Sequence, residues 1–109
     1  MSGIKLLQWR PMIRGALRGY AKLAVPINMS GDAIILHDCP AYAKNGKRWV
    51  SAPSKPQLDN GALRCDAAGK PLYSPVVEFS SRTLTDRFSD AAVRAIETKH
   101  PDAFQGGVP

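Results

Sequence analysis

The chain has 109 residues, 44% of them apolar and 22% charged, which is the composition of one ordinary globular domain. A multidomain enzyme with separate cofactor and substrate lobes is not expected at this length, and the composition excludes collagen-like and disordered chains. Fifteen Lys and Arg residues against nine Asp and Glu give a formal net charge of +6. This balance favours nucleic acid, an acidic protein or an anionic membrane surface as partner.

The positive charge is concentrated in the N-terminal third. The first 31 residues contain no acid, and their basic residues are Lys5, Arg10, Arg14, Arg18 and Lys22. No run approaches the roughly 18 apolar residues of a membrane span, and the start lacks the apolar core of a secretory signal. We therefore expect a cytoplasmic protein without a membrane partner.

In chain order, strand patterns cover residues 4–9, 17–25, 33–39 and 48–51. The first is expected to stop at Arg10-Pro11, because proline removes a ladder donor, with a loop over 11–16. The second alternates strictly between two faces, and a turn around Gly31 joins it to the third as an antiparallel hairpin. Asn45-Gly46 is a strong turn signal before the fourth strand.

Residues 53–75 differ in kind, because prolines and glycines interrupt them throughout. We expect a long loop or excursion there, centred on 56–74, followed by an edge strand over 75–79.

A helix is predicted from the capping-box pair Thr83 and Asp86 to His100, where Pro101 follows. Its apolar face consists of Leu84, Phe88, Ala91, Ala92, Ala95 and Ile96. The prediction is an α+β fold: one antiparallel sheet of four to five strands with a single C-terminal helix packed on it. The single domain spans 1–109, with its core over 4–100 and a flexible tail over 101–109.

Residues with nucleophilic or metal-binding chemistry do not form a constellation. His37, Asp38 and Cys39 are consecutive on a predicted strand, where neighbours point to opposite faces. Cys39 and Cys65 lack CxxC spacing and are expected as free thiols, and no glycine-rich loop joins a strand to a helix as in a phosphate cradle. We expect no catalytic site, metal, cofactor or small-molecule substrate.

Three basic groups are candidate contacts to phosphate. Arg18, Tyr20 and Lys22 stand in a row on one strand face, about 7 Å apart, with a tyrosine suited to base stacking between two cations. The alternative is that they are solvated residues of an exposed sheet face. The second group, beside the Asn45-Gly46 turn, is Lys44, Lys47 and Arg48, which can equally be solubilising.

The third group is Arg87 and Arg94, which share a helix face. Asp90 lies between them, so an exposed helix with weak ion pairs is the simpler interpretation of that face.

The run Ile34-Ile35-Leu36-His37-Asp38, then Gly46, then Trp49-Val50-Ser51-Ala52-Pro53-Ser54-Lys55, resembles the stage V sporulation protein G (SpoVG) family. In that family a hydrophobic strand ends in His-Asp, and a glycine-preceded strand runs into Pro-Ser-Lys. Further similarity covers 15–21, Gly61, Arg64 and Asp66, and the helix segment 87–93, so the resemblance extends over about 4–97. The segment 67–74 resembles an insertion, and Asp86, Asp90 and Glu97 dilute the basic character of the helix.

The resemblance implies a small bacterial DNA- and RNA-binding regulator that dimerises through its sheet and contacts nucleic acid near its C-terminal helix. It thereby adds weight to Arg87, Arg94 and Lys55 as contacts. The expected function is non-catalytic nucleic-acid binding by a homodimer. The alternative is a protein-protein interaction or accessory module with an acidic partner.

Overall fold

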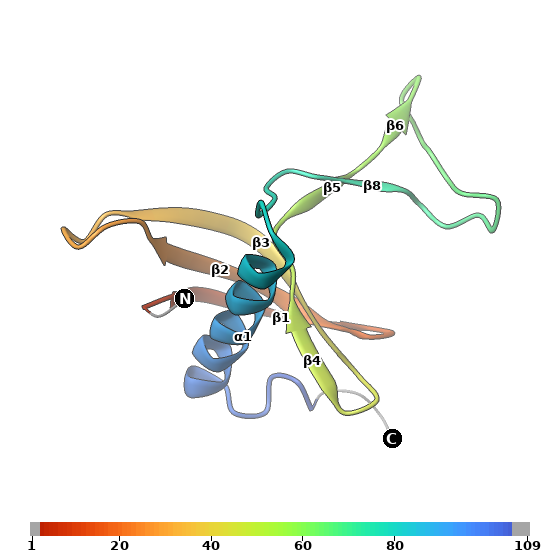
Figure 1. Cartoon of the computed structure of the whole chain (residues 1–109). Coiled ribbons are helices and arrows are strands. Elements are labelled where there is room, and N and C mark those ends of the chain that lie inside the picture. Colours follow the sequence, from red (N-terminus) through yellow and green to blue (C-terminus); the bar gives the residue numbers. More distant parts are fainter. Residues whose placement is uncertain (1–2, 106–109) are drawn as a thin grey trace.

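The structure, a computed structural model, describes residues 3–105. Its main sheet is an antiparallel meander in the order β1-β2-β3-β4, and one helix crosses a single face of it (Figure 1). The bounds are β1 Lys5–Arg14, β2 Leu17–Pro26, β3 Ala33–Lys44, β4 Lys47–Val50 and α1 Arg82–Lys99. The α+β prediction, with a four-stranded sheet and one C-terminal helix, is confirmed.

The core lies between the sheet and α1. Strict alternation on β2 buries Ala21, Leu23 and Val25 toward the helix, where Phe88 and Ile96 are fully buried. Leu36 and Leu23 belong to this core, whereas Leu17 is half-buried and Ile34 is exposed. One face of the sheet is therefore apolar and covered, as the periodicity indicated.

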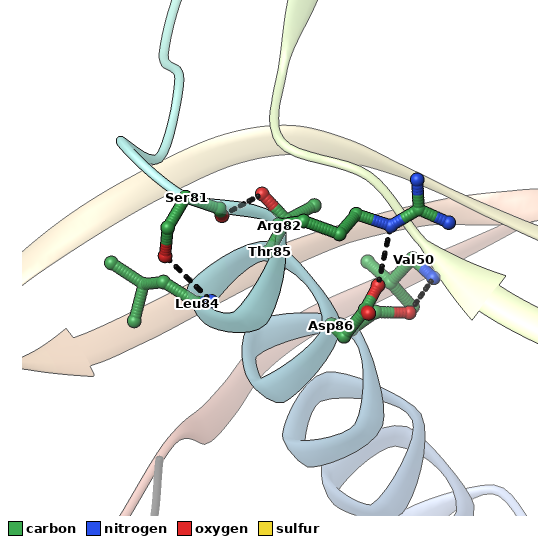
Figure 2. Close-up of polar contacts among 7 residues, drawn as sticks. Val50, Ser81, Arg82, Leu84, Thr85 and Asp86 are labelled. Atoms are coloured by element: carbon green, nitrogen blue, oxygen red, sulfur yellow. Dashed lines mark hydrogen bonds and ion pairs between the residues drawn. The ribbon is translucent and has the colours of Figure 1, made fainter.

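Helix α1 is capped at both ends, by a side chain at its start and by a backbone group at its end. Ser81 is the N-cap, and its Oγ accepts a hydrogen bond from the Leu84 N–H at 3.1 Å (Figure 2). The backbone N–H of His100 donates to the Ile96 carbonyl at 2.7 Å and ends the helix. A bond from the Val50 N–H to the Ser89 hydroxyl, 3.0 Å long, ties β4 to the helix.

Two strands run past prolines at which the sequence predicted an end. Strand β1 continues through Pro11 to Arg14, so the loop predicted over 11–16 is wrong. As an edge strand, β1 tolerates a residue without an N–H. Strand β3 likewise passes Pro40, whose carbonyl faces away from β2 and accepts the Ser51 N–H at 3.0 Å.

Register shifts at Leu7, Arg18 and the His37-Asp38 pair mark β-bulges. At the last one, Asp38 has a φ of 55°, in the left-handed region that aspartate tolerates better than most residues. The bulge resets the alternation of β3, so Leu36 and Cys39 are both buried although they are an odd number of positions apart, three. Bulges thus decide which residues face the helix.

Residues 53–76 form a projecting arm that rises from the end of the sheet (Figure 1). Within it β5 (Ser54–Pro56) pairs with β8 (Tyr73–Pro75), and β6 (Leu58–Asp59) pairs with β7 (Ala62–Leu63). The predicted excursion is therefore a narrow β-ribbon. The edge strand predicted over 75–79 is wrong: β8 ends at Pro75, and Val77 and Phe79 pack against the core instead.

The chain beyond the helix packs against the domain through Phe104. Phe104 is 7% exposed and lies 6.4 Å from the Trp9 ring, centroid to centroid. Within the tail predicted from 101, Phe104 therefore packs against the domain. The part predicted over 106–109 lies outside the described residues. In the described range, α1 is not apolar enough to span a membrane.

Candidate nucleic-acid interface

The sheet face opposite α1 carries most of the basic and aromatic side chains of the strands. Cross-strand partners share a face, and the pairs Arg10↔Tyr20 and Tyr42↔Trp49 alternate with residues buried toward the helix. We call this surface the open face; by register it includes Lys5, Gln8, Arg10, Arg14, Tyr20, Lys22, Tyr42, Lys44, Lys47 and Trp49. It therefore combines positive charge with flat aromatic rings.

Aromatic rings on the open face are held by neighbouring side chains. The Arg10 guanidinium carbon lies 5.2 Å from the centroid of the Tyr20 ring, within cation–π distance. The Tyr42 and Trp49 rings stack, with centroids 5.4 Å apart and planes inclined by 21°. These contacts fix the orientation of the rings of Tyr20 on β2, Tyr42 on β3 and Trp49 on β4.

A groove of about 490 Å³ lies between the open face and the base of the arm. Its wall includes Arg14 from β1, Tyr20 from β2, Tyr42 from β3 and Tyr73 from the arm. Burial raises the pKa of Tyr42, and the neighbouring phenols of Tyr20 and Tyr73 raise it further. Three tyrosines from different elements therefore surround one cavity beside a guanidinium group.

The open face has little negative charge to neutralise it. Asp38 lies beside Arg10, 3.4 Å from its guanidinium, and both side chains are more than half exposed, so the pair is weak. Arg14 and Lys22 make no ion pair within residues 3–105. These cations are available to an anionic ligand.

Arg18 does not stand in the row that the sequence predicted. It is the extra residue at a bulge, between the pairs Leu17↔Tyr42 and Gly19↔Ala41. Its guanidinium donates to the carbonyls of Gly15 and Leu17, at 2.7 and 3.1 Å. Tyr20 and Lys22 keep the predicted face, whereas Arg18 holds the β1–β2 turn.

The other predicted contacts lie apart from each other. Lys47 belongs to the open face, but Arg48 points to the helix side and forms an ion pair with Glu97. Lys55 is exposed on the arm and lines a second groove with Arg64. Sequence spacing did not reveal this separation.

Arg87 and Arg94 lie on the solvent side of α1, away from the sheet, and neither pairs with Asp90 in the described structure. The simpler interpretation was an exposed helix in which Asp90 pairs with both arginines. The helix face is exposed, but these two ion pairs are not formed in the described structure. The helix arginines and the open face are two separate candidate surfaces.

Cys39, two positions after His37, is a poor nucleophile. Cys39 is fully buried, and burial, with a smaller effect of Asp38, raises its pKa to about 12, so the thiol stays protonated. Cys65 is exposed, and both cysteines are free, as predicted. Between residues 3 and 105 no three His, Cys, Asp or Glu side chains gather into a possible metal site.

Several residues of the open face and of the groove beside it were not among the predicted contacts: Arg10, Arg14, Tyr42 and Trp49 of the open face, and Tyr73 of the arm. Counting outward from the Asn45-Gly46 turn pairs residue 44 with 47 and 42 with 49, so the Tyr42-Trp49 stack was accessible from the sequence. The position of Tyr73 could not be predicted in this way, because the arm has no hydrophobic pattern that indicates where the arm points.

No family model, curated protein or solved structure matches the chain. The resemblance to SpoVG therefore stays a hypothesis.

Proposed function

We propose that this protein is a small, non-catalytic bacterial regulator that binds DNA or RNA through the open face of its sheet. The single observation that carries the proposal is the combination of unpaired cations, Arg14 and Lys22, with the oriented rings of Tyr20, Tyr42 and Trp49. Cations neutralise phosphates without reading sequence, and rings stack on bases of any kind. The site thus suits binding with weak sequence preference.

The similarity to SpoVG supports the same function and adds a homodimer in the bacterial cytoplasm. Strands β1 and β4 are both edges of the sheet and offer unpaired backbone groups to a second copy. In a dimer, two open faces would double the number of phosphate contacts. The similarity also points to Arg87 and Arg94 of α1, with Lys55 of the arm, as an alternative contact surface that competes with the open face.

A protein partner with an acidic surface is the second candidate function. The net charge of +6 favours an acidic surface, and the arm favours a protein partner because its apolar side chains Leu58, Leu63 and Val76 are each more than half exposed. Such a partner would bury these residues, whereas a nucleic acid has no use for aliphatic side chains there.

Fluorescence anisotropy tests the proposal, using labelled single-stranded DNA, duplex DNA and RNA at 50 and 200 mM salt. If three or four phosphates are neutralised, the slope of log K against log salt is about −3, and affinity falls more than tenfold between the two conditions. Failure to bind all three below about 100 μM at low salt contradicts the proposal, since sequence-independent binding normally reaches that range.

A further inference from the structure

The groove between the open face and the arm has the size and lining of a pocket for one flat aromatic ligand. At about 490 Å³ it falls in the range of small-molecule sites. Tyr42 forms part of its floor on β3, and Tyr73 reaches it from the arm, so rings come from two independent elements. Tyr73 is 58% exposed although it is a large aromatic residue.

Charge complementarity identifies the kind of ligand. Arg14 and Asp38 both lie in the wall of the groove, and the Asp38 carboxylate is already paired with Arg10. Lys22 lies outside the groove, two positions along β2 from Tyr20, so cations flank the rings on the sheet side. A ligand with a flat neutral ring joined to a phosphate chain matches this arrangement: rings stack on rings, and phosphates meet the cations.

We infer that this groove holds an unstacked base of single-stranded DNA or RNA between Tyr42 and Tyr73, with an adjoining phosphate on Arg14 and a phosphate farther along the strand on Lys22. This inference rests on the proposed function. Bases in a duplex are paired and stacked within the helix, so they do not enter such a groove without paying an unstacking cost. The protein therefore prefers single strands over duplex of the same length.

Abasic oligonucleotides separate base contacts from phosphate contacts. The ligands are labelled twelve-nucleotide oligothymidine, oligouridine and an abasic chain with the same number of phosphates, together with a duplex. Wild type is expected to bind both base-containing single strands at least about fivefold more tightly than the abasic chain or the duplex. Comparison of thymidine with uridine chains separates DNA from RNA.

The decisive variant is Tyr73→Ala, on an exposed part of the arm where loss of the ring leaves the core intact. It is expected to weaken oligothymidine binding at least about fivefold while leaving the abasic chain unaffected. Tyr73→Phe keeps the ring and should bind as wild type. Leu63→Ala, which shortens an equally exposed side chain farther along the arm, is the matched control and should change nothing.

The outcomes test the base pocket separately from nucleic-acid binding as such. Equal wild-type affinity for base-containing and abasic chains, or a Tyr73→Ala variant that binds oligothymidine normally, overturns the base pocket but leaves phosphate binding standing. Absence of binding to every chain at low salt overturns both.

Discussion

The two faces of the sheet are built from the same strands and differ in almost everything else. Toward α1, alternate residues such as Leu23 and Ala41 are fully buried, and no polar side chain is buried among the described residues. Away from α1, the intervening positions carry Lys22, Tyr20 and Tyr42. The helix-covered face stabilises the domain, so the open face is free to carry charge and aromatic rings.

This division teaches that a stable core does not need the open face. Because long basic side chains there contact mainly solvent, substitutions on that face should change binding with little loss of stability. Substitutions on the covered face should lower stability and have little direct effect on binding.

The largest expected effect is the difference between Cys39 and Cys65 in their rate of reaction with a thiol reagent. With a pKa of about 12, Cys39 is about one part in ten thousand thiolate at pH 8, and its side chain is fully buried. A thiol-specific reagent at pH 8 should therefore modify Cys65 at once and Cys39 only after denaturation. Because the pKa of Cys39 is raised in the folded state, folding favours its neutral thiol. The contribution of this thiol to the free energy of unfolding is therefore complete below pH 9 and declines from pH 9 toward 12.

Two thiols reacting equally fast in the native protein would contradict this placement of Cys39. The control is Cys65→Ser, which should leave no rapidly reacting thiol.

Phe88→Ala should destabilise the domain by about 3–5 kcal/mol, because the ring is fully buried and packs 4.9 Å from the ring of Phe79. Thermal melting should show a fall in Tm of 10 °C or more, given about 4–8 °C per kcal/mol for a small domain. Arg87→Ala, on the adjacent exposed position, should remain within about 0.5 kcal/mol. A Phe88 variant that melts like wild type would mean that α1 is not docked on this face.

Gly19→Ala should cost about 2 kcal/mol although it adds a single methyl group. A Cβ at this position would lie 2.6 Å from the Arg10 carbonyl oxygen and 2.7 Å from the Trp9 ring, so β1 and β2 must move apart. Ala24→Val, on the same strand but on the open side, should be neutral within about 0.5 kcal/mol. Chemical denaturation measures both, and equal midpoints for Gly19→Ala and wild type would rule out the close approach.

Much of the fold was predictable from local pattern. The alternation of 17–25, the Asn45-Gly46 turn and the helical periodicity around Phe88 each depend on neighbours in sequence, and each appears where expected. The bulges do not follow from such patterns, because inserting one residue into a ladder depends on the partner strand. The bulge at Arg18 therefore removed a predicted contact, and the one at His37-Asp38 shifted the alternation of β3.

The candidate site was less predictable than the fold. Tyr20 and Lys22 could be found because they lie on one alternating strand, and Trp49 because it flanks a recognisable turn. Arg14 was placed in a loop, since Pro11 was expected to end β1. Tyr73 belongs to an arm whose direction is set by backbone pairing of β5 with β8, which leaves no hydrophobic pattern in the sequence.

The most direct test of the account compares charge reversal on the two candidate surfaces. Arg14→Glu with Lys22→Glu changes the open face, and Arg87→Glu with Arg94→Glu changes α1 by the same net charge. Anisotropy with twelve-nucleotide oligothymidine from 50 to 200 mM salt measures both variants. The account predicts that the open-face variant loses more than tenfold in affinity at 50 mM and flattens the salt slope by about 1.4, while the helix variant binds nearly as wild type. Loss of binding in the helix variant alone would place the nucleic acid on α1 and contradict the open-face site.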